Sequence, residues 1–433
     1  MLKSKILLLA GFLALCLWAE VRSAPLAKDQ ADPLEGIDFY KLFNNPDGRL
    51  HIASRLTTVD RIEEHGYPAE YHEVTTEDGY IIGLFRIPYS HNLQNQDEVR
   101  PIAFIQHGLF SSSDGWPNLG PNDALPFLLS DAGYDVWLGN ARGNTYSRRH
   151  TSLSTDHPSF WRFSWHEIGY YDIAAAIDYC LSTENGLKQK EKAIHYVGHS
   201  QGTTVFFTLM SMRPEYNDKI KTAHMLAPVT YMNHMADWLV STLAPYLGHH
   251  NTYSELFCSQ EFLPYNDFVL ALFFNTCRPN SVVGQFCDGV LYDGSDESRY
   301  NTTASALNAQ VHPAGVSTDQ ILHYMQEQQS GHFRQFDFGT KKNLKHYGSE
   351  VPPDYPTEKI TCNMHLWYAD NDEMASVEDV LRVAETLPNK VMHHMGDPLW
   401  DHNDFAMNWE VRKYINDPVI AIMNEYENPS NEL

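Results

Sequence analysis

A serine stands between two glycines in the segment Gly198-His199-Ser200-Gln201-Gly202. An apolar run over residues 193–197 precedes it and a helix-forming run follows it, so the segment predicts a strand, a tight turn and a helix. The glycines let the strand and helix pass close together while the serine adopts a strained backbone conformation. A hydroxyl at the apex of such a turn is exposed, and we predict that Ser200 is a nucleophile. A glycine-rich turn without chemistry is the alternative interpretation.

Short apolar runs alternate with helical patterns after Pro101. The runs cover residues 102–105, 134–138, 193–197, 223–226 and 364–368, and helical patterns include 172–180 and 376–387. Buried strands that alternate with helices predict an α/β protein with a mostly parallel sheet covered on both faces. The alternation stops over residues 229–353, a stretch rich in Tyr, Phe, His and Asn that we interpret as an insertion.

The remaining segments complete the predicted domain organisation. The sheet domain is expected over residues 51–228 and 354–427, on either side of the insertion. Residues 24–50 carry many Pro, Asp and Gly and are expected to form a weakly ordered N-terminal segment, and residues 428–433 a frayed tail.

The first 23 residues differ from the rest of the chain. Lys3 and Lys5 precede a short apolar run, and Val21 and Ser23 are small residues placed for cleavage. The run is shorter than a membrane-spanning helix requires, and no later segment has the necessary length of unbroken apolar residues. We therefore expect a signal peptide over residues 1–23 and an exported chain without a transmembrane anchor.

Acidic residues outnumber basic ones by 55 to 31, which gives a formal net charge of -24. Removal of the signal peptide with Lys3, Lys5, Arg22 and Glu20 would leave -26. This balance argues against nucleic acid as a partner. Protonation of all 22 histidines with the carboxylates still ionised would bring the charge to -4, an idealised limit near about pH 5.

Five of the six cysteines remain once Cys16 leaves with the signal peptide. Cys277 and Cys287 are close in sequence within a loop-rich stretch and are the best candidates for a disulfide in an oxidising compartment. Cys180 lies on an apolar helix face and is predicted to be a buried thiol. The sequon that begins at Asn301 predicts glycosylation at the surface of an exported chain.

A serine nucleophile needs a general base, and the base needs an acid that orients it. Asp372 follows the apolar run 364–368, where a strand end would deliver its carboxylate to the edge of the sheet that carries Ser200. His402 comes 30 residues later, before the final helix. The chain order Ser, Asp, His is that of a hydrolase-type sheet.

Alternatives to two members of this set remain open. Asp370 lies two residues before Asp372 and could serve as the acid. His393 and His394 compete with His402 for the role of base, but they fall earlier, near a run that has the pattern of a strand.

A tetrahedral intermediate also needs amide donors aimed at its oxyanion. The segment 107–109 follows the first apolar run, and we expect the backbone N–H of Leu109 to be one donor and that of Gln201 the other. His166-Glu167 has no second histidine at helical spacing, and the chain has neither a Cys-x-x-Cys pair nor a phosphate-binding glycine loop. We therefore expect no metal and no organic cofactor.

Six longer motifs follow one another along the chain. They read EDGY at residues 77–80, RIPY at 86–89, QHGL at 106–109, DAGYDVWLGN at 131–140, RGNT at 142–145 and HYVGHSQGTT at 195–204. In these motifs, and over about residues 57–423, the chain resembles the acid lipases, the family of gastric and lysosomal lipases with many insect digestive relatives. It differs from the family in reading Ala-Asp-Asn-Asp at residues 369–372 and in carrying the additional Cys258.

The resemblance implies an α/β-hydrolase fold whose inserted, mainly helical cap, with a mobile lid, corresponds to residues 229–353. It also implies that the cysteine pair noted above is the disulfide of the cap. The positions that match the nucleophile, acid, base and two oxyanion donors of the family are Ser200, Asp372, His402, Leu109 and Gln201.

The activity implied is that of a secreted serine lipase, active at acidic pH, that hydrolyses esters of neutral lipids such as triacylglycerol through an acyl-enzyme. A carboxylesterase, a sterol esterase and a noncatalytic lipid-binding protein of the same fold are the alternatives. The expected partners are a lipid-droplet or emulsion interface and the ester substrate. The expected location is extracellular, for instance a digestive lumen, with the lysosome as the alternative.

Overall fold

The computed structural model describes residues 56–264, 299, 304, 307–308 and 310–429. Several sequence predictions fall outside these residues, namely the signal peptide, the N-terminal segment 24–50, the pair Cys277 and Cys287, and the sequon at Asn301. These stay predictions. No helix among the described residues is long and apolar enough to cross a membrane.

Nine strands form one sheet within the described part of the chain, in the order β1-β2-β4-β3-β6-β7-β10-β11, with β5 paired to β2. They are β1 (Glu70–Thr75), β2 (Tyr80–Ile87), β3 (Ile102–Gln106), β4 (Asp135–Leu138), β5 (Arg149–His150), β6 (Ile194–His199), β7 (Ile220–Leu226), β10 (Met364–Tyr368) and β11 (Lys390–His394). From β4 to β11 all neighbours are parallel, whereas β2 runs antiparallel to β1, β4 and β5. The predicted, mostly parallel sheet is confirmed.

The apolar runs noted in the sequence lie in the central strands of the sheet. Every residue of β3, β4, β6 and β7 is buried, because helices cover a parallel sheet on both faces. The antiparallel strands β1 and β2 were not predicted from the sequence. In β1 only Val74 is buried, and polar side chains such as Glu70 and Glu73 interrupt its apolar pattern.

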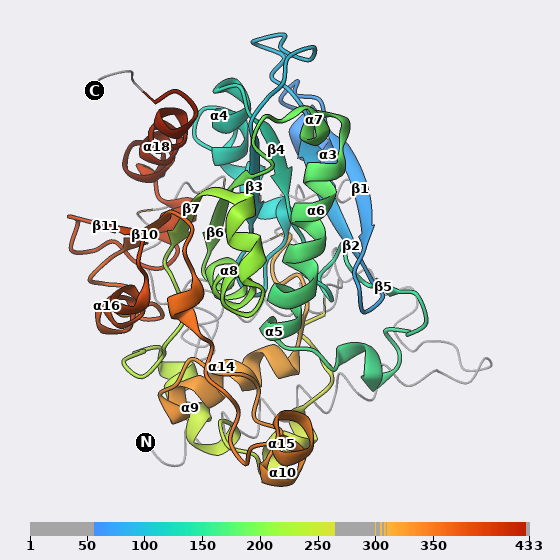
Figure 1. Cartoon of the computed structure of the whole chain (residues 1–433), viewed down its shortest axis with the longest axis vertical. Helices are drawn as coiled ribbons and strands as arrows, with labels where there is room; N and C mark the ends of the chain where they lie inside the picture. The colour runs from blue at the N-terminus through green and yellow to red at the C-terminus, as the bar shows by residue number, and fades with distance from the viewer. Residues whose placement is uncertain (1–55, 265–298, 300–303, 305–306, 309, 430–433) are drawn as a thin grey trace, which may run out of the picture.

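Helices pack against the sheet, and all but the last of them lie between its strands along the chain. They are α4 (Leu125–Asp131), α6 (Ala174–Ser182), α8 (Gln201–Met212), α16 (Val377–Thr386) and α18 (Asp417–Glu427), which follows the last strand. Figure 1 shows α6 and α8 in front of the central strands and α16 close to β10 and β11. Cys180 on α6 is a buried free thiol, as predicted.

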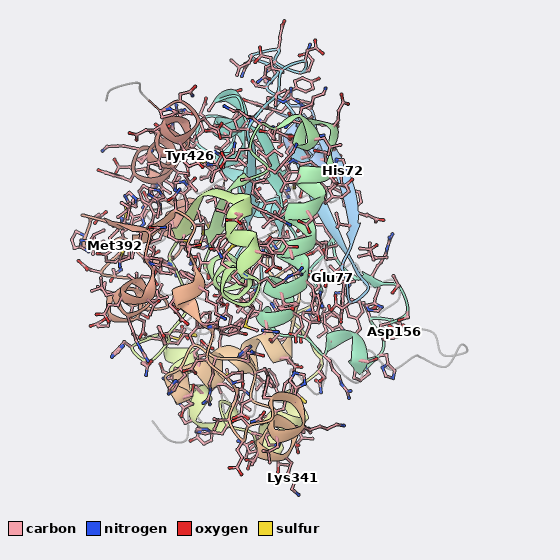
Figure 2. The ribbon with its side chains drawn as sticks, in the orientation of Figure 1. His72, Glu77, Asp156, Lys341, Met392 and Tyr426 are labelled. Atoms are coloured by element: carbon pink, nitrogen blue, oxygen red, sulfur yellow. The ribbon has the colours of Figure 1, made fainter. Side chains whose placement is uncertain are left out.

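Between β7 and β10 the chain leaves the sheet and forms a separate group of elements. The helices are α9 (Trp238–Leu247), α10 (Thr252–Phe257), α14 (Thr318–Ser330) and α15 (Thr340–Tyr347), with a small ribbon of β8 (Glu261–Phe262) and β9 (Val316–Ser317). They gather at one end of the molecule, where Figure 2 places Lys341 of α15. Leu243, Phe257, Leu322 and Met325 belong to a second apolar cluster within this group, which we call the cap.

The buried guanidinium of Arg142 joins three parts of the sheet domain. It donates to Asp172 at 2.6 and 2.8 Å and to Asp78 at 2.5 and 2.9 Å, and it stacks over the ring of Tyr80 at 3.9 Å. Arg142 follows β4, Asp78 lies in the β1–β2 turn and Asp172 precedes α6. Burial raises the pKa of Asp172 to about 6 despite the charge of Arg142. One cation therefore holds together segments that are distant in sequence.

We expect Arg142→Met to lower the free energy of unfolding by about 3 to 5 kcal/mol, because it leaves Asp172 buried without a cation. Urea unfolding at neutral pH measures the loss. The control is Arg149→Met, whose ion pair with Glu73 is exposed and is expected to contribute less than about 1 kcal/mol. Equal losses in the two variants would contradict this account.

Candidate active site

The strand order of the sheet reverses between β3 and β6. The chain passes from β3 to β4 on one side and later returns to β6 on the other. At such a point the loops that leave the carboxyl ends of two adjacent parallel strands diverge and leave a crevice, which is where α/β sheets bind ligands. Leu109 follows β3 and Ser200 follows β6, so the fold brings these two predicted site residues to the same crevice.

Ser200 occupies the strained turn that the sequence predicts. Its backbone has φ +53° and ψ -121°, a conformation that residues with side chains rarely adopt. A Cβ atom at Gly198 would lie 2.6 Å from the carbonyl oxygen of Gly202, and one at Gly202 would lie 2.4 Å from that of Gln106. Both flanking residues must therefore be glycines for β6 and α8 to cross this closely.

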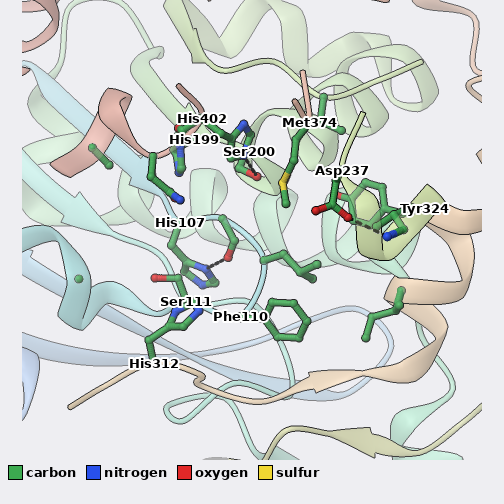
Figure 3. A pocket seen from close by; sticks show the side chains of 18 of the residues that line it. His107, Phe110, Ser111, His199, Ser200, Asp237, His312, Tyr324, Met374 and His402 are labelled. Atoms are coloured by element: carbon green, nitrogen blue, oxygen red, sulfur yellow. Dashed lines mark hydrogen bonds between the residues drawn. The ribbon is translucent and has the colours of Figure 1, made fainter. Parts of the chain in front are cut away.

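Hydrogen bonds connect Ser200, His402 and Asp372 in series. The Nε2 atom of His402 lies 2.7 Å from the Ser200 Oγ atom, and its Nδ1 atom lies 3.0 Å from both carboxylate oxygens of Asp372. A carboxylate only accepts, so Nδ1 carries the ring proton and Nε2 accepts from the hydroxyl. This tautomer is the one that can remove the serine proton. Figure 3 shows Ser200 and His402 together at the wall of a cavity.

The carboxylate of Asp372 is fully buried and nevertheless charged. Its Oδ1 atom also accepts from the backbone amides of Met374 at 2.9 Å and Ala375 at 2.7 Å. Burial favours the neutral acid, but the hydrogen bonds from His402 and these amides, and attraction to His402 when its ring is protonated, outweigh burial and lower the pKa of Asp372. Asp372 is therefore suited to orient the imidazole and to stabilise its charged form.

The structure places the alternative acid and bases away from Ser200. The carboxylate of Asp370 is 57% exposed and pairs with His394 at 2.8 Å. His393 lies on β11 with its ring stacked on Trp367 at 3.9 Å between centroids. Of the aspartates considered, it is Asp372 that contacts His402.

The two predicted oxyanion donors lie next to the nucleophile. The backbone N–H groups of Leu109 and Gln201 have no hydrogen-bond acceptor among the described residues. That of Gln201 is at the start of α8, where the helix dipole favours negative charge. A Cβ atom on Gly108, the residue before Leu109, would lie 3.0 Å from the Cβ atom of Ser200. Both amides are thus available at the crevice.

Sequence reasoning did not assign a role to His107, which holds the loop that carries Leu109. Its Nε2 atom accepts from the backbone amide of Ala141 at 3.1 Å, so Nδ1 carries the proton and donates to the carbonyl oxygen of Gly108 at 2.7 Å. Burial lowers the pKa of His107 to about 4 and keeps the ring neutral above that pH. Only the coordinates reveal these partners, because Ala141 lies in a different loop.

A cavity of about 210 Å³ lies over Ser200 and under the cap. Its lining is mostly apolar. The loop after β3, the segments after β7 and β10, the segment around His402, and α9 and α14 of the cap all contribute, and the apolar residues include Met232, Met235, Leu243, Ile321, Met325 and Met374. These residues come from separated segments, which is why no local pattern marks them as a group. Within the described residues, no three His, Cys, Asp or Glu side chains are placed to hold a metal ion.

Comparison with known proteins agrees with this site. Residues 58–120 match the model of a partial alpha/beta-hydrolase lipase region, and residues 101–405 match that of the alpha/beta hydrolase fold. The chain is 43% identical over 371 residues to Lipase 3 of Drosophila melanogaster, which covers 85% of this chain and 93% of that protein. It is 35% identical over 388 residues to gastric triacylglycerol lipase of Bos taurus, covering 89% and 94% of the two chains, and 34% identical over 384 residues to that of Homo sapiens, covering 87% and 94%. The chain therefore belongs to the acid lipase family of α/β hydrolases and is a carboxylic ester hydrolase of the lipase type.

Proposed function

We propose that this lipase hydrolyses triacylglycerol and related neutral-lipid esters through an acyl-enzyme formed on Ser200. The observation that carries the proposal is the hydrogen-bonded series from Asp372 through His402 to Ser200, placed at the wall of an apolar cavity. The similarity to gastric triacylglycerol lipases supports the choice of substrate. An apolar cavity under a cap is suited to bind an acyl chain and to exclude water from the ester.

The proposed reaction uses each group in turn. His402 takes the proton of Ser200 as its Oγ atom attacks the ester carbonyl carbon, and the amides of Leu109 and Gln201 donate to the oxyanion. The intermediate collapses to an acyl-enzyme, and the departing alcohol takes the proton from His402. Water then attacks the acyl carbon with His402 again as base, which releases the fatty acid and restores the serine. Asp372 stays ionised throughout and stabilises the imidazolium.

The lining of the cavity supports a range of acyl chains. Met232, Met235, Met325 and Met374 contribute flexible, polarisable side chains that can adapt to ligands of different shape. Branched and aromatic residues such as Leu243, Ile321 and Phe262 complete the apolar lining beside these methionines. We therefore include esters of several fatty acids among the proposed substrates.

We further propose that the enzyme is secreted and works in acid, with a digestive lumen as its destination and the lysosome as the alternative. The signal-like residues 1–23 support export. Among the buried titratable groups, Asp319 supports an acidic working pH, and His107 and His199 are compatible with one. Burial lowers the pKa of His107 and of His199 to about 4, and burial raises the pKa of Asp319 to about 7. All three side chains are thus mainly neutral between these values.

We expect Ser200→Ala to reduce the hydrolysis of emulsified triacylglycerol by at least about 10⁴-fold while the melting temperature stays near that of the wild type, because the nucleophile is lost without loss of packing. Fatty-acid release by titration measures the rate, with a dissolved short-chain ester as the second substrate. A wild-type enzyme that hydrolyses only the dissolved ester would favour a carboxylesterase. An inactive wild type would favour a noncatalytic lipid-binding protein.

We expect Asp372→Asn to lower kcat by about 10⁴-fold, because an amide cannot stabilise the imidazolium and favours the wrong tautomer of His402. The matched control is Asp370→Asn, whose exposed carboxylate contacts His394 instead, and it should keep the wild-type kcat. Steady-state kinetics on the dissolved ester measure both. Equal losses would refute the assignment of the acid.

Asp319 should make the cap more stable in acid. Because its pKa is higher in the folded chain, its contribution to stability is fully present below its ordinary pKa of 3.8 and is lost as the pH rises through about 7. We expect the melting temperature of Asp319→Asn relative to the wild type to rise steadily between about pH 4 and pH 7.5. Thermal unfolding across that range measures it, and a constant difference would be the contrary result.

A further inference from the structure

His199, the residue before the nucleophile, contacts the backbone of His402. Its Nε2 atom lies 2.9 Å from the carbonyl oxygen of His402, and the two rings are 5.1 Å apart at 44°. A carbonyl oxygen only accepts, so the Nε2 atom of His199 carries a proton and donates it. His199 is the last residue of β6 and its side chain is buried. The hydrogen bond therefore runs from the rigid central sheet to the segment that carries His402.

The segment around His402 is also packed into the core through Trp400 and Phe405, and the bond from His199 contacts the backbone of His402 itself. His402 lies outside the regular elements, between β11 and the short helix α17 (Asp404–Met407). Asp401 shapes the local turn, because its Oδ1 atom accepts the backbone amides of Asn403 at 3.0 Å and Asp404 at 3.1 Å. These bonds are internal to the turn and do not fix it to the sheet. Asp372 orients the imidazole of His402, and His199 holds its backbone.

We propose that His199 is a positioning residue for His402, and that its Nε2–H donor holds the backbone of His402 where the imidazole can reach Ser200. Figure 3 shows His199 and His402 beside each other next to Ser200. A displacement of about 1 Å in a reacting group can cost about 100-fold in rate, so a bond that fixes this backbone affects turnover directly. The inference rests on the proposed function of Ser200, His402 and Asp372 as catalytic residues.

The donor stays available under the proposed working conditions. Burial, and after it repulsion from His402 when that ring is protonated, lowers the pKa of His199 to about 4. A neutral ring has one N–H, and the acceptor on His402 assigns that proton to Nε2. The neutral ring also adds no second positive charge beside the imidazolium that forms on His402 during the reaction. The same contact thus orients the base without opposing its protonation.

A packing role for His199 must be separated from its role as a donor. The ring also borders the oxyanion loop, because a Cβ atom at Gly108 would lie 3.4 Å from the Nδ1 atom of His199. Removal of the whole side chain would therefore disturb Leu109 as well. Two substitutions of similar size, one with a donor and one without, distinguish the roles.

The experiment compares His199→Leu and His199→Gln on a dissolved short-chain ester. Leucine fills the site without a donor, and we expect kcat to fall by about 100-fold while KM changes little. Glutamine can place an amide N–H close to the position of the Nε2 atom and should restore most of the wild-type kcat. The control is His195→Leu, a buried histidine of the same strand that bonds to Thr222 and Glu427. It should keep the wild-type kcat even where its melting temperature falls.

The His199 variants test the positioning role, and the wild type and Ser200→Ala test the proposed function. Wild-type kcat in folded His199→Leu, a rise in KM alone, or a folded His199→Gln that is as slow as the leucine variant would overturn the positioning role. If the leucine variant does not fold, His199→Met supplies a more flexible side chain without a donor and takes its place. Failure of the proposed function would instead appear as a wild type that hydrolyses no ester, or as a Ser200→Ala variant that remains active.

Discussion

The site depends on the close crossing of β6 and α8 over the end of β3. Without side chains at Gly198 and Gly202, the backbone passes within distances that a Cβ atom would not allow. The crossing forces Ser200 to a positive φ, a strain of about 1 to 3 kcal/mol that persists because its surroundings fix it. The backbone amide of Ser200 donates to the carbonyl oxygen of Leu226 on β7 at 3.1 Å, so the sheet itself holds the turn. The hydroxyl of Ser200, the amide of Gln201 and the ring of His199 all take their directions from this one turn.

The sequence predicts the strands best where helices bury the sheet on both faces. Mainly apolar runs identify β3, β4, β6, β7 and β10, because a strand covered by helices on both faces carries few polar residues. The location of Asp372 and Ser200 at one edge of the sheet could be predicted for a related reason, since parallel strands that point the same way end at the same edge. Strand β1 was not predicted because polar side chains interrupt its apolar pattern. Strand β2 carries an apolar run over residues 81–85 that was not interpreted as a strand.

Contacts between distant segments distinguish the candidates that the sequence left open, and they support Asp372 as the proposed acid. Whether Asp370 or Asp372 reaches His402 depends on the conformation of the loop after β10. The hydrogen bonds from the backbone amides of Met374 and Ala375 to Asp372 exist only in the folded loop. The roles of His107 and His199 depend on partners such as Ala141 and His402 that lie far away in sequence. With 22 histidines in the chain, composition alone could not distinguish these two from the rest. The predicted cap disulfide lies outside the described residues, and Cys258 is a free thiol.

Helix α14 of the cap is hydrogen-bonded to helix α8 of the sheet domain. On α14, Gln320 donates to the side chain of Gln201 at 3.1 Å, and one turn later Tyr324 donates to Thr204 at 3.1 Å. Both partners lie on the first turn of α8, the helix that begins at the nucleophile. The side chains of Gln320 and Tyr324 are buried, so a movement of α14 away from α8 would break both hydrogen bonds, at a net cost of about 0.5 to 1.5 kcal/mol each. Any opening of the cap that admits a lipid is therefore easier in elements other than α14, which stays with the nucleophile and keeps one wall of the cavity in place.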